Sequence, residues 1–353
     1  MRAKRFLIAA MAGISCAFLS TANAQDAGEP VILKVEHFMP AGATANAELV
    51  VPWCNRLEEA SKGRLKCEVY PSMQLGGKPA QLPQLLRNNV IDVIFTAYGY
   101  TAGGFPRSEV MELPFSVPQD MYVANEILWE FMNTYGSEDV KDFKLLGVFS
   151  DGGGAFHTSK KQIASLGDLS GMRMRASTRM TSKFLQSLDA APVSMPPSQI
   201  SDAVSKGVID GVLGVWELLP PTKLDETTFF HTESGPDQAA TAITPLTMMM
   251  NKERYESLPD DLKAIVDEYS GPALNRLDAD AYTAATKKAR DKTLASSEHT
   301  FITMNDAFYR AMKEKSSTVT AEWLDGPEIS GVDRAELLKG FQDIVRKHAP
   351  DLK

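Results

Sequence analysis

Two arginines near the middle of the chain have the chemistry to hold an anion. The turn at 166–171 leads into Met172-Arg173-Met174-Arg175-Ala176, which alternates like a β-strand. Alternation puts Arg173 and Arg175 on one face, and a guanidinium at a strand end is a planar fork that suits a carboxylate. Two arginines on one face are also typical of a solvated surface. From these residues alone, both interpretations stay open.

Aromatic residues gather in the connections around the same predicted sheet. Ligands of α/β proteins commonly bind where strands end and loops begin. Tyr98 and Tyr100 follow one predicted strand, and Trp216 follows another. Core packing is the alternative explanation for most aromatic residues. The set that we consider is Tyr98, Tyr100, Phe105, Phe156 and Trp216.

Catalytic and metal-binding motifs are not apparent in the sequence. The glycines at 152–154 are not followed by the Gly-Lys-Ser/Thr of a phosphate loop, and no Gly-x-Ser-x-Gly elbow occurs. No histidine pairs with another at metal-ligand spacing. We therefore expect a binding protein without cofactor or metal, and not an enzyme. The five histidines are His37, His157, His231, His299 and His348.

The elements that must position these residues alternate between strand and helix, as in an α/β protein. Short apolar runs such as 90–95 suit strands that are covered on both faces. The predicted strands are 31–36, 65–70, 90–95, 144–149, 172–176 and 208–213. The predicted helices are 48–61, 81–88, 122–135, 198–206, 260–269, 273–295, 306–324 and 334–348.

A weak internal sequence repeat suggests two similar lobes. Pro71-Ser72-Met73 leads through a predicted helix into Val90-Ile91-Asp92, and Pro192-Val193-Ser194-Met195 leads through another into Val208-Ile209-Asp210. The equivalence makes Asp210 a structural rather than a catalytic residue. Chance is the alternative, but a repeat predicts two lobes with a cleft between them, where small ligands bind.

Two cysteines, Cys54 and Cys67, are expected to face the same helix–sheet interface. Cys54 follows the apolar spacing of a helix, whereas Cys67 lies on the apolar face of an alternating strand. In an oxidising compartment we expect a disulfide between them. Two packed free thiols are the alternative, because the sequence does not give the distance between their Cα atoms.

The N-terminus has the pattern of a cleaved signal peptide. Basic residues precede the apolar run 6–19, and Ala22-Asn23-Ala24 supplies the small-x-small pattern. The apolar run is short for a transmembrane anchor, and Cys16 lacks a good lipobox. We expect residues 1–24 to be removed and the chain to be periplasmic, as in a Gram-negative bacterium.

Composition limits the partners. The chain has 37 basic and 45 acidic residues and no basic block, which speaks against nucleic acid or an anionic membrane surface. The roughly 330 residues that follow the signal exceed one usual core, which favours two lobes.

Several short segments, from the strand with Arg173 and Arg175 to the internal repeat, match a known family. In these segments the chain resembles the solute-binding proteins of tripartite ATP-independent periplasmic (TRAP) transporters, of the dicarboxylate-binding (DctP-like) branch. The match spans nearly the whole mature chain, and it is specific in its order although each segment is weak alone. The segments are 61–66 (SKGRLK), 70–77 (YPSMQLGG), 112–115 (ELPF), 168–175 (DLSGMRMR), 191–193 (APV), 205–211 (SKGVIDG), 250–252 (MNK) and 258–262 (LPDDL).

The resemblance implies two α/β lobes, joined by crossing strands and a long helix, that close around a ligand. Residues 30–152 with 240–280 would form the first lobe, and 153–239 with 281–353 the second. Arg175 takes the position of the family's signature arginine, which would bind the substrate carboxylate, whereas Arg173 is expected to be structural.

Two departures from the family pattern bear on the ligand. Ala155 stands where the family often has a second arginine, and Gly214 stands where it often has asparagine. Both changes remove polar donors. We therefore expect a monocarboxylate with an apolar or aromatic body rather than a sugar acid or a dicarboxylate. The ligand-binding residues expected beside Arg175 are Tyr98, Tyr100, Phe156, Trp216, His37, Phe38 and His157.

The resemblance also implies partners. The loaded protein would deliver its ligand to small and large integral-membrane subunits of a transporter. The alternatives are the binding protein of an ATP-driven importer, a binding protein that feeds a membrane sensor, and a periplasmic enzyme acting on an organic acid. The sequence leaves a homodimer open.

Overall fold

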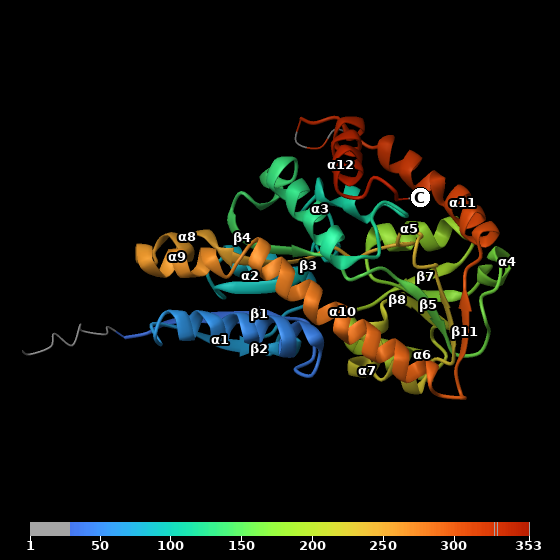
Figure 1. Cartoon of the computed structure of the whole chain (residues 1–353), viewed down its shortest axis with the longest axis horizontal. Coiled ribbons are helices and arrows are strands. Elements are labelled where there is room, and N and C mark those ends of the chain that lie inside the picture. The colour runs from blue at the N-terminus through green and yellow to red at the C-terminus, as the bar shows by residue number, and fades with distance from the viewer. Residues whose placement is uncertain (1–28, 328, 330, 353) are drawn as a thin grey trace, which may run out of the picture.

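The computed structural model describes residues 29–327, 329 and 331–352. The predicted signal peptide lies outside them. The described chain forms two sheets with helices around them, which confirms the expected α/β class (Figure 1). Within the described part, no helix has the length and apolar character needed to span a bilayer. The helices are α1 (Val51–Ala60), α2 (Leu82–Arg87), α3 (Met121–Thr134), α4 (Leu166–Leu169), α5 (Arg179–Ser187), α6 (Ile200–Ser205), α7 (Leu219–Thr222), α8 (Lys252–Glu256), α9 (Asp260–Glu268), α10 (Pro272–Leu294), α11 (Asp306–Leu324) and α12 (Arg334–His348).

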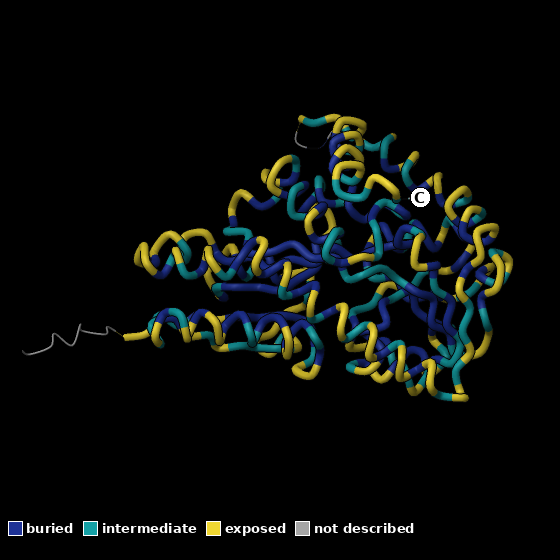
Figure 2. Tube along the Cα trace, viewed as in Figure 1, coloured by how far each residue is buried: buried dark blue, intermediate teal, exposed yellow. Residues whose placement is uncertain are grey.

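The first sheet has the strand order β2-β1-β3-β10-β4. Its parallel part is β1 with β2 and β3, and β10 runs antiparallel between β3 and β4. Helices cover this sheet, so that its central strands are buried (Figure 2). The strands are β1 (Val31–His37), β2 (Leu65–Tyr70), β3 (Val93–Ala97), β4 (Phe143–Phe149) and β10 (Leu246–Asn251).

The second sheet has the strand order β11-β9-β5-β8-β6-β7. Here β6 is parallel to β7 and β8, and β5 is antiparallel to β8 and β9. Each sheet thus places an antiparallel strand beside a parallel trio. The strands are β5 (Ala155–Thr158), β6 (Arg173–Ala176), β7 (Ala191–Ser194), β8 (Gly211–Gly214), β9 (Phe230–Glu233) and β11 (Thr300–Thr303).

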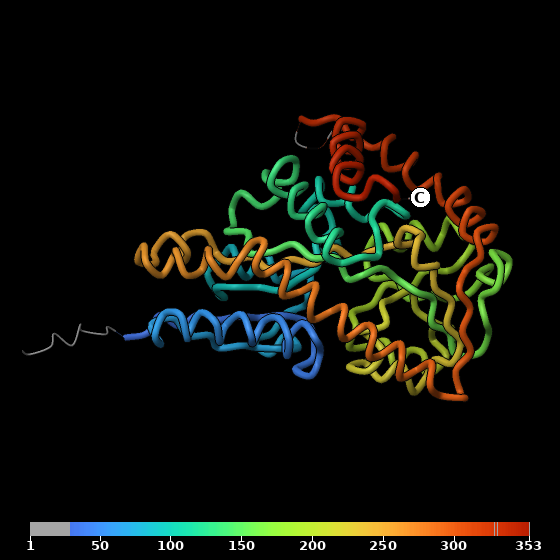
Figure 3. Tube along the Cα trace, viewed as in Figure 1, coloured from blue at the N-terminus to red at the C-terminus, as the bar shows by residue number. Residues whose placement is uncertain are grey.

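The chain crosses between the two sheets three times from β4 to β11. Residues 150–154 lead from β4 into β5, and residues 234–245 lead from β9 back into β10. The long helix α10 then packs on α3 beside the first sheet and runs to the second (Figure 3). At its far end Arg290 forms an ion pair with Glu233 of β9. The expected architecture, two lobes with crossing segments and a long helix, is confirmed.

The repeated Val-Ile-Asp segments, 90–92 and 208–210, lie just before strands β3 and β8 and are not part of them. Val90 and Val208 are exposed, and β3 and β8 begin at Val93 and Gly211. Asp92 accepts a hydrogen bond from the backbone N–H of Lys34 at 2.8 Å, and its own N–H donates to the carbonyl of Lys34 at 2.9 Å. Asp92 therefore joins the start of β3 to the neighbouring strand β1 through both its side chain and its backbone.

Asp210 repeats this contact in the second sheet. Its carboxylate accepts from the N–H of Arg173 at 2.8 Å, and its N–H donates to the carbonyl of Arg173 at 2.7 Å. These matching backbone contacts support the internal repeat that the sequence suggested.

The cysteine prediction is confirmed. Cys54 of α1 and Cys67 of β2 form a disulfide, with their Cα atoms 5.8 Å apart. The bond joins a helix to the strand that follows it within the first lobe.

The C-terminal helix lies differently from the expected grouping. Phe341 of α12 packs edge-on against Phe131 of α3 at 5.3 Å between ring centroids, and His348 contacts Glu130 of α3 at 2.7 Å. Figure 1 shows α12 above α3. The chain thus returns to the first sheet after α11, so the boundary drawn for residues 281–353 differs from the packing here. The other lobe limits stay a prediction.

Candidate ligand-binding site

A cavity lies where the crossing segments meet the carboxyl ends of strands from both sheets. Strand ends β1, β6 and β8 contribute to it, and so do both crossing segments and α10. Its walls come from parts of the chain that are far apart in sequence. The lining residues are Phe38, Met39, Phe95, Tyr100, Asp151, Gly154, Arg175, Ser177, Thr181, Pro197, Leu213, Gly214, Val215, Glu217, Leu218, Ala242, Ile243, Thr244, Leu246 and Tyr282.

Arg175 is the one basic residue among these lining residues. It is the last residue but one of β6 and is only 3 % exposed. Its Nε donates to the carbonyl of Met195 at 3.2 Å, which orients the guanidinium. Among the described residues it forms no ion pair with a carboxylate within 4.0 Å. A buried guanidinium without an acidic partner is a natural place for the carboxylate of a ligand.

Arg173 has a different environment although it lies on the same strand. Its guanidinium donates to both oxygens of Asp210, at 3.1 and 2.6 Å, and the side chain is 46 % exposed. This arginine is already paired and does not line the cavity. The structural role expected for Arg173 agrees with this pairing.

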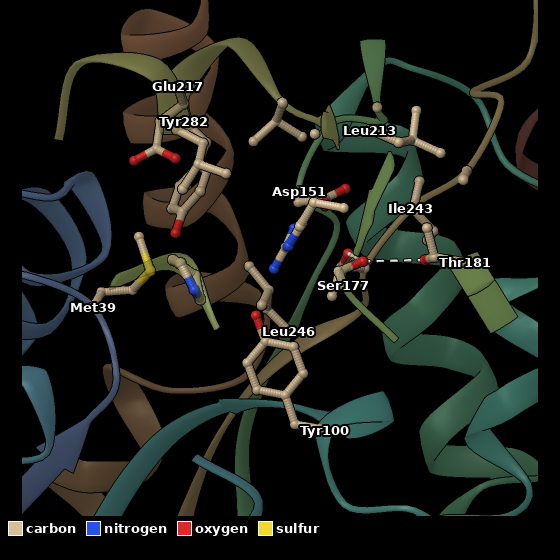
Figure 4. A pocket seen from close by; sticks show the side chains of 18 of the residues that line it. Met39, Tyr100, Asp151, Ser177, Thr181, Leu213, Glu217, Ile243, Leu246 and Tyr282 are labelled. Atoms are coloured by element: carbon tan, nitrogen blue, oxygen red, sulfur yellow. Dashed lines mark hydrogen bonds between the residues drawn. The ribbon is translucent and has the colours of Figure 1, made fainter. Parts of the chain in front are cut away.

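Aromatic rings form one wall of the cavity. Phe38 stacks on Phe95 at 5.9 Å and meets the ring of Tyr100 edge-on at 5.0 Å. Tyr282 of α10 approaches from the other side, and the hydroxyl groups of Tyr100 and Tyr282 point toward one another (Figure 4). Of the aromatic residues expected to contact the ligand, Phe38 and Tyr100 thus line this cavity.

Five of the expected side chains lie outside it. The hydroxyl of Tyr98 donates to Thr247 at 3.2 Å within the first core, and His37 contacts Asn46 Oδ1 at 2.9 Å. Both side chains fill space behind the wall formed by Phe38 and Phe95. They are placed to support the wall and not to touch the contents of this cavity.

The other three lie in the second sheet. Trp216 stacks on Phe301 at 5.5 Å and meets His157 edge-on at 4.7 Å. Phe156 is fully buried in the core of this sheet. Alternation along β5 places Phe156 and His157 on opposite faces of the sheet, and neither face opens into the cavity that holds Arg175.

Three titratable lining residues, Asp151, Glu217 and Tyr282, were among those that sequence reasoning missed. Asp151 follows β4 directly, so a strand-end argument could have found it. Glu217 is next to Trp216, and the short 3₁₀ turn Trp216–Leu218 turns the glutamate into the cavity and the tryptophan away from it. Tyr282 lies within α10, where local sequence carries no sign of a site.

Two buried carboxyl groups give the cavity an acidic side. Burial raises the pKa of Asp151 to about 6, although hydrogen bonds from Thr244 and Gly153 act in the opposite direction. Burial also raises the pKa of Glu217, which accepts a hydrogen bond from the backbone N–H of Thr44 at 3.2 Å. The cavity therefore combines one guanidinium with two carboxyl groups that resist ionisation.

Burial also raises the pKa of the Tyr100 hydroxyl, and the positive charge of the nearby Arg175 acts in the opposite direction. Arg175 and Tyr100 thus form one polar end of the cavity. Ser177 and Thr181 lie next to it, with Ser177 Oγ within 3.1 Å of Thr181 Oγ1.

The chain matches a family of known proteins over most of its length. Residues 35–325 match the family described as bacterial extracellular solute-binding protein, family 7 (DctP). The chain belongs to this family. Its members are substrate-binding receptors of transporters, so this family-7 chain is a TRAP solute-binding protein and not an enzyme.

Solved structures of family-7 proteins share the fold. A TRAP solute-binding protein of a marine metagenome, specific for aromatic acids and solved with 3-hydroxybenzoate, is 37 % identical with a TM-score of 0.86, and the match covers 91 % of this chain and 100 % of that one. A protein of Rhodoferax ferrireducens T118, solved with copurified benzoate, is 36 % identical with a TM-score of 0.86, covering 91 % and 99 %.

A more distant relative is the sialic acid-binding periplasmic protein SiaP of Vibrio cholerae. It is 22 % identical over 253 residues, which cover 71 % of this chain and 76 % of that protein. Relatives of this kind are periplasmic, which supports a periplasmic location for this family-7 chain.

Proposed function

We propose that this chain captures an aromatic monocarboxylate and delivers it to a TRAP-type membrane permease. The observation that carries the proposal is Arg175, a buried guanidinium without a carboxylate partner, beside a wall of aromatic rings. Two similar proteins with 37 % and 36 % identity were solved with 3-hydroxybenzoate and benzoate. The aromatic body fits the rings, and the carboxylate fits Arg175.

Capture would proceed by closure of the two lobes, with no covalent step. Phe38, Met39 and Tyr100 come from the first lobe, whereas Arg175, Ser177 and Leu213 come from the second. A separate groove between the same parts of the chain shares Phe38, Tyr100 and Ser177 with the cavity. We propose this groove as the path by which the ligand enters when the lobes part.

Ligand class is tested by a thermal-shift screen followed by calorimetry. Because binding to the folded state raises stability by mass action, benzoate and hydroxybenzoates are expected to raise the melting temperature. Succinate and sialic acid are expected to leave it unchanged. A shift with these two compounds and none with aryl carboxylates would overturn the proposed ligand class.

Arg175→Ala is expected to weaken benzoate binding at least about a hundredfold, which corresponds to about 2.7 kcal/mol. The carboxylate would then be buried without a counter-charge, and breaking such a pair costs about 3–5 kcal/mol. Arg173→Ala is the matched control, because Arg173 is paired with Asp210 outside the cavity. Retained affinity in Arg175→Ala, measured by calorimetry, contradicts the assignment.

Delivery is the second part of the proposal. The partners would be the small and large integral-membrane subunits of a TRAP transporter, in keeping with the family. Uptake of labelled benzoate by cells that express the permease should require this protein. If uptake is independent of it while the purified protein binds benzoate, a membrane sensor is the better partner.

A further inference from the structure

The side of the cavity away from Arg175 is polar in a way that carboxylate binding does not use. Glu217 and Tyr282 lie next to one another there (Figure 4). Tyr282 is 2 % exposed, and its hydroxyl has no hydrogen-bond partner among the described residues. A buried hydroxyl that points into a cavity without a partner needs one from what the cavity holds.

The charges at this side are acidic. Glu217 and Asp151 line the cavity, and Asp278 lies buried on the same helix as Tyr282. Arg175 is the one basic lining residue, and its charge acts on Tyr100 and Asp151 rather than on Glu217. A ligand therefore meets the positive charge of Arg175 and the carboxyl group of Glu217 at different places in the cavity, while Asp151 is close enough to Arg175 for the two charges to interact.

We propose that Glu217 and Tyr282 form a second polar subsite, which accepts a hydroxyl group on the ring of an aromatic monocarboxylate and rejects a second carboxylate. This inference rests on the proposed function, since it presumes that Arg175 holds the first carboxylate. A phenolic O–H donates to the Glu217 carboxyl group, and Tyr282 completes its hydrogen bonding. At a pH above the raised pKa values of these two carboxyl groups, a second carboxylate would meet the negative charges of Glu217 and Asp151, and like charges repel.

Thr44 fixes the orientation of the Glu217 carboxyl group, so that one oxygen is already hydrogen-bonded and the other is left for the ligand. One oxygen of Glu217 accepts from the N–H of Thr44 at 3.2 Å, and the Thr44 hydroxyl also favours the charged carboxylate. In Glu217→Gln, the amide oxygen would keep the Thr44 contact and the NH₂ group would replace the other oxygen. The variant thus exchanges an acceptor for a donor without changing size.

The experiment measures dissociation constants by calorimetry for benzoate, its 3- and 4-hydroxy derivatives, and benzene-1,3- and 1,4-dicarboxylate. The compounds differ only in the ring substituent. For the native protein we expect at least one hydroxybenzoate to bind about five- to tenfold more tightly than benzoate, which is the effect of one good hydrogen bond. The dicarboxylates are expected to bind at least about a hundredfold more weakly than benzoate.

Glu217→Gln should retain benzoate binding within about threefold, reduce the hydroxyl preference below about twofold, and improve binding of a dicarboxylate at least about tenfold. Tyr282→Phe should reduce the hydroxyl preference without that gain. Glu226→Gln is the matched control, because Glu226 is exposed in a neighbouring turn. Improved dicarboxylate binding is a gain that a merely structural role of Glu217 would not produce.

The outcomes separate the two proposals. If the native protein binds no aromatic carboxylate, the proposed function fails and this inference fails with it. If it binds benzoate but shows no hydroxyl preference, or if Glu217→Gln keeps both the preference and the rejection of dicarboxylates, only the second subsite is overturned. A variant that melts at a much lower temperature is replaced by Glu217→Met, which should abolish the hydroxyl preference as well.

Discussion

Arg173 and Arg175 lie two residues apart on β6 and yet have different partners. The alternation of the strand predicts that they share a face, but it does not say which end of that face borders a cavity. In the structure Asp210 pairs with Arg173, whereas Arg175 reaches the cavity behind Tyr100. The resemblance to a family singled out Arg175, and no local pattern distinguished the two arginines.

Asp210 offers a test at the residue scale. Hydrogen bonds to Arg173 hold the pKa of this carboxyl group below its ordinary value, and they tie the turn before β8 to β6. Asp210→Asn keeps one acceptor but loses the ion pair. We expect it to lower the free energy of unfolding by about 1–2 kcal/mol and to leave ligand affinity unchanged.

Urea unfolding measures the first effect and calorimetry the second. Asp92→Asn is the parallel variant in the first sheet, where Asp92 pairs with Arg254 and holds Lys34. A loss of ligand affinity in Asp210→Asn at unchanged stability would show that Asp210 is more than a structural clamp.

At the scale of elements, contacts join the start of α5 to the segment before α3. Arg179 donates to both carboxylate oxygens of Glu109, at 2.6 Å each from one nitrogen, and Thr178 donates to Glu112. Glu109 and Glu112 belong to the segment before α3, on the side of the first sheet. Because α5 follows a strand of the second sheet while Glu109 and Glu112 lie on the side of the first, we expect these contacts to form only when the proposed lobes are closed.

Arg179→Gln is therefore expected to weaken ligand binding by up to about fivefold, and chiefly through faster dissociation. The limit is small because the arginine is 47 % exposed and such pairs contribute about 1 kcal/mol or less. Stopped-flow displacement measures the dissociation rate. Arg173→Gln is the control, because its ion pair with Asp210 lies within the second sheet. Equal dissociation rates for the two variants would contradict the expectation that the Arg179–Glu109 contact slows ligand release.

The elements also show how far sequence reasoning reaches. Long helices with apolar spacing, such as α10 and α11, were predicted within a residue at each end. Strand β10 was not predicted, because every one of its residues is buried and it shows no alternation. The sequence pointed to Trp216 as a ligand contact, but its neighbour Glu217 lines the cavity instead. Which of the two side chains points into the cavity depends on how the 3₁₀ turn leaves β8, and the sequence does not give that.

For the whole molecule, a row of histidines links stability to pH. His157 Nδ1 lies 2.8 Å from His231 Nδ1, and His231 Nε2 lies 2.9 Å from His299 Nδ1. His157 Nε2 contacts the carbonyl of Gly214 at 3.2 Å, so the row reaches the cavity wall. Burial lowers the pKa of His157 to about 3, and burial and the neighbouring histidines lower that of His231 as well.

Below its ordinary pKa of 6.5, His157 takes up a proton in the unfolded state before the folded state does. The free energy of unfolding is therefore expected to fall as the pH drops from about 6.5 toward 3, by up to about 1.4 kcal/mol per pH unit for each such group. Urea unfolding between pH 4 and 7 should show a smaller slope in His157→Gln than in the native protein. Equal slopes would mean that carboxylates alone set the acid sensitivity.

The lobes themselves were predictable because the sequence repeats a pattern and resembles a family. Their limits were not, since α12 returns to α3 through contacts such as Phe341 on Phe131, which no local signal encodes. The cavity residues likewise include some that local sequence could indicate and some that it could not. Arg175 lies near the end of β6, and Phe38 and Tyr100 follow the ends of β1 and β3. Tyr282 reaches the cavity only because α10 crosses between the sheets.

The disulfide between Cys54 and Cys67 has a consequence for the order in which the chain matures. A polypeptide that leaves the cytoplasm with its N-terminus first exposes both thiols while most of the second lobe is still to be translocated. They are the two cysteines of the described chain, and 13 positions separate them. If the predicted signal peptide with Cys16 is removed, these two cysteines have only each other to pair with. Because the bond joins α1 to β2, it ties together elements of the first sheet alone and places no covalent link between the two sheets.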